Sequence, residues 1–181
     1  MIGCWREIGI VGNGACERLP ALGIPTSATG ISTVGWVPGI ERLAAAGPPV
    51  RLALSLHAAD EALRSELMPV NDRYPLKDVL AACLRWHERR RRQVFVEYLM
   101  LDGVNDRYEQ AMALADLLEP RLAFKVNLIP YNPTEAGFRG SGRDAIDAFR
   151  SALEGRGVRT TVRLTRGHDI DAACGQLAAR G

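Results

Sequence analysis

Short runs of β-branched and apolar residues alternate along this chain with stretches whose apolar residues recur every three or four positions. The short runs are typical of buried strands, and they occupy residues 30–34, 50–56, 94–100, 124–129 and 158–164. The intervening stretches are typical of helices. They occupy residues 37–46, a stretch opened by Asp60, a longer one begun by Pro75, one capped by Asn105, and one following Ser141. Strands that alternate with helices predict an α/β fold with about five parallel strands and flanking helices.

Three of the predicted helices show one apolar face each. These faces are formed by Leu76, Leu80, Cys83 and Trp86, by Ala111, Leu114 and Leu118, and by Ile146, Phe149 and Leu153. We expect Asn105 to cap the second of these helices. We expect Ser141 and Asp144 to form a capping box for the third.

Polar residues follow four of the predicted strands. In parallel sheets the carboxyl ends of the strands meet at one rim, where ligands bind. The residues at this rim are Ser55 and His57, Asp102 and Asn105, Tyr131 and Asn132, and Thr165, Arg166 and Asp169. Taken alone, a histidine such as His57 is more often structural than a ligand contact, and an asparagine such as Asn132 often only braces a turn. Because five strands are too few for an eight-stranded barrel, we expect a half-barrel or an open sheet with exposed edges.

Basic residues are the one unusual feature of the composition. The net charge is +2, and of 23 basic side chains only Lys77 and Lys125 are lysines. Arginine suits bidentate phosphate contacts, although GC-rich coding enriches it as well. The four arginines at 89–92 either complement a helix dipole or follow the phosphates of a nucleic acid. Arg163 and Arg166, beside the rim, are better placed for substrate phosphates.

The first 28 residues show no clear element beyond a short apolar run at 8–11. No run approaches the roughly 18 apolar residues of a membrane span, and no signal peptide is recognisable, so a cytosolic location is expected. Cys4, Cys16, Cys83 and Cys174 are widely spaced, which favours free thiols. Cys83 is predicted to be a core thiol, and Cys174 is readable either as an inert buried thiol or as an accessible one.

Five segments resemble, in order and spacing, the RlmN/Cfr class of radical S-adenosylmethionine RNA methyltransferases. They are ISTVGWVPGI at 31–40, LSLHA at 54–58, VEYLMLDGVND at 96–106, KVNLIPYNP at 125–133 and TRGHDIDAACGQL at 165–177. The similarity is greatest to the RlmN branch, which methylates adenine C2 in ribosomal and transfer RNA. It implies that residues 29–181 form the C-terminal half of a partial (β/α) barrel, whereas residues 1–28 match nothing in the family.

The resemblance also implies roles for individual residues. Ser32, Ser55, Leu56, His57 and Asn132 match the family's contacts to S-adenosylmethionine. Cys174 matches the cysteine that is methylated and then carries the methyl group, as a protein-bound radical, to the adenine ring. The family uses a [4Fe–4S] cluster, a reductant for that cluster, and rRNA and tRNA as substrates.

Two motifs of the family do not occur in this sequence. They are the cluster signature Cys-x3-Cys-x2-Cys and a Gly-Glu-Pro motif that holds the methionine amine of the cofactor. Adenine C2 is unactivated, and radical chemistry at this carbon needs a cluster held by thiolates. We therefore expect a truncated or frame-shifted product that is inactive alone.

Two other functions stay open on the residues alone. A non-catalytic remnant would bind RNA or a protein partner through its arginines and its open sheet edge, independently of Cys174. An unrelated βα-barrel enzyme would bind phosphate esters near Thr165 and Arg166 and would not depend on RNA.

Overall fold

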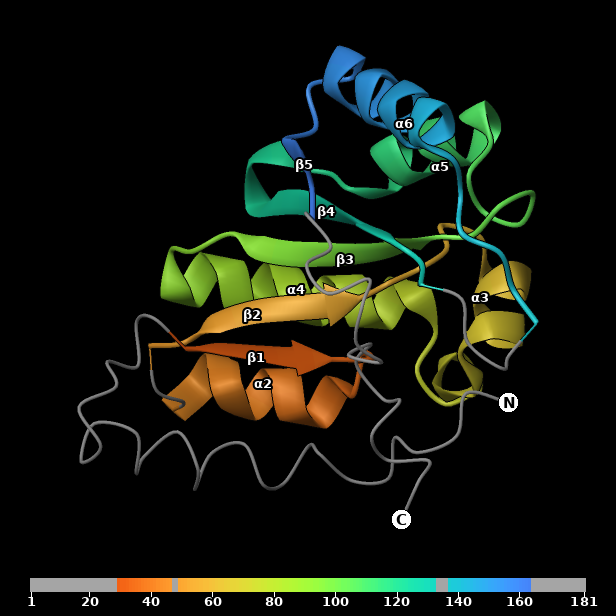
Figure 1. Cartoon of the computed structure of the whole chain (residues 1–181). Coiled ribbons are helices and arrows are strands. Elements are labelled where there is room, and N and C mark those ends of the chain that lie inside the picture. Colours follow the sequence, from red (N-terminus) through yellow and green to blue (C-terminus); the bar gives the residue numbers. More distant parts are fainter. Residues whose placement is uncertain (1–28, 47–48, 133–136, 164–181) are drawn as a thin grey trace.

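The computed structural model describes residues 29–46, 49–132 and 137–163, which form one five-stranded sheet (Figure 1). The strand order is the sequence order, and every neighbouring pair is parallel. The strands are β1 (Gly30–Thr33), β2 (Arg51–Ser55), β3 (Val94–Met100), β4 (Phe124–Pro130) and β5 (Thr160–Val162). The predicted α/β fold with five parallel strands is confirmed. The run at 8–11, the boundary at residue 29 and the segment after 163 lie outside the described residues and stay predictions.

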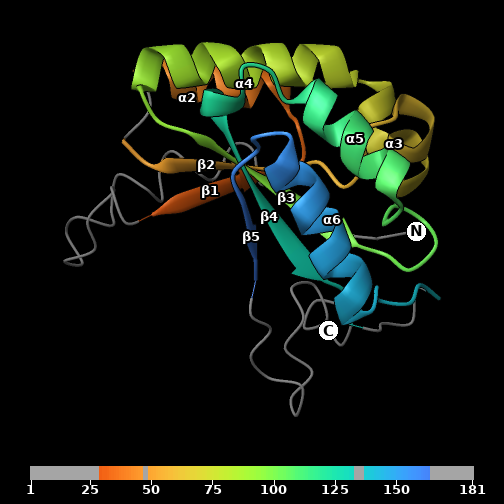
Figure 2. The ribbon, with the colours of Figure 1, turned by 90° about the horizontal axis from the view of Figure 1, so that it is seen from above.

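Helices cover one face of this sheet. Figure 2 shows α2, α4, α5 and α6 along the same side of the strands. The helical segments are α2 (Val37–Ala46), α3 (Glu61–Leu67), η3 (Pro69–Asp72), α4 (Leu76–Arg90), α5 (Tyr108–Leu117), η4 (Arg121–Ala123) and α6 (Arg143–Gly155). None of the helices in the described segments has the length and apolar character needed to cross a membrane.

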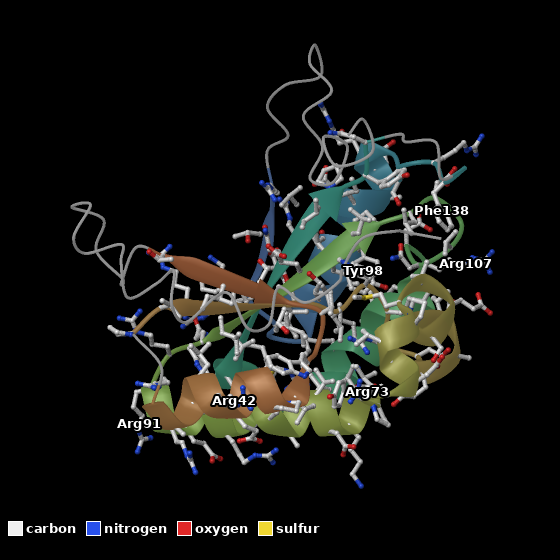
Figure 3. All side chains as sticks on the ribbon, turned by 90° about the horizontal axis from the view of Figure 1, so that it is seen from below. Arg42, Arg73, Arg91, Tyr98, Arg107 and Phe138 are labelled. Carbon is white, nitrogen blue, oxygen red and sulfur yellow. The ribbon has the colours of Figure 1, made fainter. Side chains whose placement is uncertain are left out.

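The core lies between the sheet and this helical layer. Each apolar helix face predicted from the sequence is buried there, and Cys83 and Trp86 of α4 are among its members. The Tyr98 and Phe149 rings join β3 to α6, with centroids 5.2 Å apart. In Figure 3, Tyr98 lies within the fold, while Arg42, Arg91 and other labelled arginines lie on its outside. The predicted core thiol at Cys83 is therefore confirmed.

Two predicted helix caps are wrong. Helix α5 begins after Arg107, whose backbone N–H donates to the Gln110 side chain at 2.9 Å, whereas Asn105 is buried and bonded elsewhere. Helix α6 begins after Gly142, which makes no side-chain cap. The Ser141 hydroxyl donates instead to the Asp106 carboxylate, at 2.7 Å. In both cases a tertiary hydrogen bond takes the side chain that local pattern assigned to a cap.

Candidate functional site

The sheet face opposite the helices carries a row of polar side chains. Successive strand residues point to opposite faces, and in β2, β3 and β4 every second residue is buried against the helices. The residues between them lie on the opposite face, which we call the open face because no helix of the described segments covers it (Figure 2). Strand pairing places Ser55, Glu97, Asn127 and Thr161 opposite one another from β2 to β5. Four neighbouring strands therefore present polar groups at one level.

Glu97 is the acidic member of this row. Its carboxylate accepts a hydrogen bond from the Ser55 hydroxyl at 3.5 Å, and the Thr161 hydroxyl donates to the Asn127 side chain at 3.3 Å. No cation among the described residues forms an ion pair with Glu97. Because an ionised carboxylate has about four acceptor sites, Glu97 can also accept hydrogen bonds from the hydroxyls of a ligand. Acidic side chains bind ribose hydroxyls in this way in other α/β folds.

His57 is held in one tautomer just beyond β2. Its backbone is left-handed, with a φ of 63°, which turns the chain at the end of the strand. The backbone N–H of Leu99 donates to His57 Nδ1 at 3.1 Å, so the neutral ring carries its proton on Nε2. Burial, followed by the charge of Arg64, lowers the pKa of His57 from 6.5 to about 4. At neutral pH the ring therefore offers a hydrogen-bond donor and does not act as a base.

Asn105 fixes the turn that carries His57. Its side-chain amide donates to the carbonyl oxygens of His57 and Leu99, at 2.8 and 2.6 Å, and its Oδ1 accepts from the N–H of Leu101 at 2.8 Å. The Tyr98 hydroxyl donates to the Asn105 carbonyl at 2.8 Å. One buried amide thereby joins the ends of β2 and β3. Hydrogen bonds from this buried side chain therefore hold His57 and Leu99 of the rim in place.

Arg64 of α3 joins the segments that follow β1 and β2. This arginine is fully buried, and its guanidinium donates to the carbonyls of Val34 and Leu56, at 2.9 and 3.3 Å, and to the Asn71 side chain. Burial lowers the pKa of Arg64, while Glu61 opposes that shift. The residues that follow β1 and β2 are therefore anchored to a single cation.

Asn71, which is buried, and Glu61, which is exposed, complete the network around Arg64. The Asn71 amide donates to Glu61 Oε2 at 2.6 Å and to the Ser65 hydroxyl at 3.0 Å, and the other Glu61 oxygen accepts from the Leu76 N–H at 2.9 Å. A buried charge is costly unless hydrogen bonds satisfy its donors. Arg64 forms no ion pair within the described residues, so these hydrogen bonds and the attraction of Glu61 offset the cost of its burial and tie α3 and the start of α4 to the rim.

The other predicted contacts occupy different positions. Ser32 lies on β1, exposed on the open face and paired with Ala53 of β2. Leu56 has a fully buried side chain, and both of its backbone groups are bonded, its N–H to the Glu97 carbonyl at 3.0 Å. Asn132 is half-buried two residues beyond β4. Ser55 and His57 are thus brought beside Glu97 and Leu99, and Ser32 lies one strand away.

Several predicted residues lie outside the described part of the chain. Cys174, Thr165, Arg166 and Asp169 all follow residue 163. Their roles stay predictions.

Sequence reasoning missed Glu97 and Arg64. Glu97 stands inside a strongly apolar run, and strand alternation puts it on the face opposite Val96 and Tyr98, which the helices cover. Arg64 stands in the polar sequence EALRSEL, where it reads as a surface residue. Strand alternation could have found Glu97, whereas no local signal marks Arg64.

Comparisons with known proteins agree with this architecture. No protein-family model matches the chain. A protein of Frankia casuarinae named "Probable dual-specificity RNA methyltransferase RlmN" is 55% identical over 163 residues, which cover 88% of this chain and 38% of that protein. A protein of the same name from Chloroflexus aurantiacus is 51% identical over 156 residues, and this chain covers 42% of its length. This chain therefore spans about two fifths of the length of these relatives.

Solved structures show the same relationship. A radical SAM methyltransferase from Sphaerobacter thermophilus superimposes with a TM-score of 0.82 at 46% identity, over 86% of this chain and 46% of that one. A domain of a pyruvate-formate lyase-activating enzyme from Bacteroides vulgatus has a TM-score of 0.65 at 14% identity, which shows a shared fold alone. Over most of its length the chain is therefore similar to the C-terminal portion of the proteins named as RlmN-type RNA methyltransferases and of the radical SAM methyltransferase from Sphaerobacter thermophilus.

Proposed function

We propose that the rim and open face bind S-adenosylmethionine within a radical SAM enzyme that methylates adenine C2 of rRNA and tRNA. The observation that carries this proposal is the grouping of Ser55, Glu97 and His57. They offer a hydroxyl, an acceptor carboxylate and a fixed N–H donor on two neighbouring strands. A nucleoside carries the complementary groups, which are ribose hydroxyls and ring-nitrogen acceptors. Ser32 and Asn132, at the same end of the sheet, belong to this proposed site.

The buried supports of the rim add to this proposal. Binding sites work best when their side chains are held in place before the ligand arrives. Asn105 and Arg64 supply such support. Asn105 donates a hydrogen bond to the backbone carbonyl of His57, and Arg64 donates one to the backbone carbonyl of Leu56. The rim is therefore suited to a specific small ligand.

The iron–sulfur cluster of the family does not fit the described residues. These residues include no group of three His, Cys, Asp or Glu side chains that could hold a metal. Cys83 is buried in the core, where burial raises the pKa of its thiol to about 12. We therefore assign no cluster ligand here. RNA methylation is proposed only for a protein that also contains a cluster-binding part.

Cys174 is proposed as the residue that carries the methyl group. A thiolate sulfur is a strong nucleophile near neutral pH, whereas a serine hydroxyl is a poor one. RNA as substrate, a reductant as partner and a cytosolic location are parts of the same proposal. They rest on the resemblance and on the names of the relatives.

Calorimetric titration of the 181-residue chain with S-adenosylmethionine tests the site. We expect saturable binding, and we expect Ser55→Ala and Glu97→Gln each to weaken it about tenfold, because each removes a polar contact worth roughly 1.5 kcal/mol. Ser151→Ala is the matched control, since Ser151 is exposed on α6 and bonds only its own helix in the described structure. Absence of binding by the unmodified chain would overturn the proposed site. RNA binding without cofactor binding would favour the non-catalytic alternative.

A further inference from the structure

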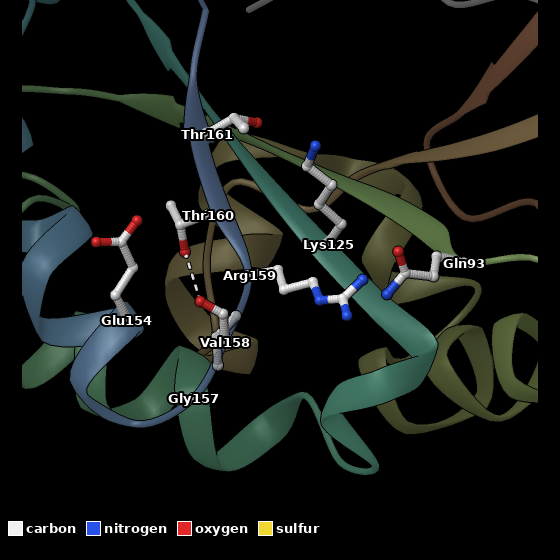
Figure 4. A pocket seen from close by; sticks show the side chains of 8 residues that line it. All are labelled: Gln93, Lys125, Glu154, Gly157, Val158, Arg159, Thr160 and Thr161. Atoms are coloured by element: carbon white, nitrogen blue, oxygen red, sulfur yellow. Dashed lines mark hydrogen bonds between the residues drawn. The ribbon is translucent and has the colours of Figure 1, made fainter.

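A second polar site lies on the open face, at the amino-terminal end of β4 and β5. A shallow groove of about 500 Å³ runs along β5, and its lining includes Gln93, Lys125, Arg159 and Thr161 (Figure 4). This end of the strands is opposite the rim. The groove begins two residues before the row of Ser55, Glu97 and Asn127 and shares Thr161 with that row, whereas Lys125 and Arg159 are not among the residues proposed for the cofactor.

Lys125 and Arg159 lie directly opposite each other in this groove. Val126 pairs with Thr160, and the Val126 N–H donates to the Arg159 carbonyl at 2.8 Å. Lys125 and Arg159 are the preceding residues of the two strands, so their side chains point to the same face. Neighbouring strands are about 4.8 Å apart, which places two positive side chains side by side. Figure 4 shows both on the same side of β4.

Strand β5 extends this positive charge along its length. Residues two apart in a strand share a face, so Arg159, Thr161 and Arg163 all belong to the open side. At about 3.3 Å per residue, the two arginines start roughly 13 Å apart, with a hydroxyl between them. Arg159 and Arg163 are both exposed. Lys125, Arg159 and Thr161 line the groove, and Arg163 continues the positive charge beyond it towards the rim; we call these four residues the cationic groove.

No carboxylate in the described residues neutralises the cationic groove. Glu154, which lines the same cavity, lies 4.0 Å from the Arg150 guanidinium on its own helix. The Lys125 ammonium lies 5.9 Å from the centre of the Phe95 ring, and none of the three cations has an ion-pair partner among these residues. Like charges directly opposite each other on neighbouring strands are destabilising. An anion bound between them would remove that repulsion.

We propose that the cationic groove binds backbone phosphates of RNA. The phosphate chemistry follows from the cations and the Thr161 hydroxyl. The open, shallow form of the groove suits a polymer that passes over β5, since small-molecule sites enclose most of their ligand. The choice of RNA as the source of the phosphates rests on the proposed function. Phosphate contacts of this kind position a nucleic acid without reading its bases.

Fluorescence anisotropy with a labelled single-stranded RNA tests this proposal on the 181-residue chain. Each of the variants Lys125→Gln and Arg159→Gln is expected to raise the Kd several-fold and to lower the slope of log K against log salt by about 0.7, as expected for one lost phosphate contact. Arg89→Gln is the matched control, because Arg89 is exposed in the last turn of α4 and its loss makes the same change in net charge. This control is expected to bind RNA like the unmodified chain.

Two further measurements make the outcome decisive. Titration of the same variants with S-adenosylmethionine is expected to show unchanged affinity, which demonstrates that they are folded and separates this proposal from that of the cofactor site. Inorganic phosphate, at the concentration of the RNA phosphates, is expected not to displace the RNA. Unchanged RNA affinity in both groove variants, an equal loss in Arg89→Gln, or full displacement by inorganic phosphate would each overturn the proposal.

Discussion

The side-chain amide of Asn105 donates a 2.8 Å hydrogen bond to the backbone carbonyl of His57, which lies 48 positions earlier in the chain. The same amide also bonds the Leu99 carbonyl, and the Leu99 N–H donates to the His57 ring. Asn105 and His57 therefore form one unit that joins the ends of β2 and β3. The proposed cofactor site depends on this unit for its shape.

Replacing Asn105 with Ala should destabilise the fold and weaken cofactor binding together. The variant leaves the Leu101 N–H and the carbonyls of His57 and Leu99 without their partner, so we expect a loss of about 2–3 kcal/mol in the free energy of unfolding. Urea denaturation measures this loss. Asp60→Ala, which removes the side-chain cap of α3 at an exposed position, is expected to cost only about 1 kcal/mol. Equal losses in the two variants would contradict the role given to Asn105.

Arg64→Met tests the buried cation that anchors β1 and β2. Methionine fills much of the space but leaves the carbonyls of Val34 and Leu56 without a donor and breaks the pair with Asn71. Because each buried acceptor left without a donor costs roughly 1–3 kcal/mol, we expect the free energy of unfolding to fall by about 3–5 kcal/mol. Arg73→Met, at an exposed position, is expected to change it by less than about 0.5 kcal/mol. A loss below 1 kcal/mol for Arg64→Met would show that water replaces the guanidinium at little cost.

His57 should make the stability of the fold fall in mild acid. The folded ring has a pKa of about 4, below its ordinary value of 6.5, so between these pH values the unfolded chain binds a proton that the folded chain does not. The free energy of unfolding is therefore expected to decrease as the pH falls from 6.5 towards 4. We expect about 2 kcal/mol from this residue, because the half-buried ring keeps some contact with water.

His57→Asn is the variant that isolates this effect. Asparagine tolerates a left-handed backbone, and its side-chain oxygen can accept the Leu99 N–H in place of Nδ1. Denaturation curves for both proteins at several pH values give the comparison. The asparagine variant should lose less stability between pH 6.5 and pH 4. Parallel pH profiles would argue against a shifted histidine.

Cys83 should resist thiol reagents as long as the chain is folded. Its side chain is fully buried on α4, and burial raises the pKa of the thiol to about 12, so almost no thiolate is present at neutral pH. Alkylation followed by peptide mass spectrometry should find Cys83 unmodified in buffer and fully modified in denaturant. Rapid labelling of Cys83 in the native protein would show that the core opens locally.

Cys174 is to be tested in a chimera that supplies the cluster-binding part of a full-length relative. Cys174→Ala should abolish methyl transfer to RNA, because no hydroxyl or amide nearby in sequence can replace a thiolate as methyl acceptor. Mass spectrometry after incubation with labelled S-adenosylmethionine should locate the label at Cys174. Label on Cys83, or full activity of the alanine variant, would refute the assignment.

Most of the fold could be predicted from the chain because buried parallel strands leave clear apolar runs. The predicted strand at 94–100 coincides with β3, and the others differ from the structure by a few residues at their ends. The helix caps failed because Asn105 and Ser141 serve contacts that are distant in sequence. Glu97 does not stand out in the sequence because its neighbours in β3 are apolar, although strand alternation directs its side chain to the open face. Hydrogen bonds between residues that are distant in the chain, such as those of Asn105 and Ser141, leave no local pattern in the sequence.

Strand order that follows sequence order also has a kinetic consequence. Within the described residues each strand pairs only with its neighbours along the chain, so every pairing closes a loop of one βα unit, except that of β2 with β3. That pairing encloses both α3 and α4 and has the largest loop-closure entropy of the four. Because folding rates fall as contacts become less local, we expect the β2–β3 pairing to form late. The Asn105–His57 unit, which spans this pairing, would then assemble in the last stage of folding.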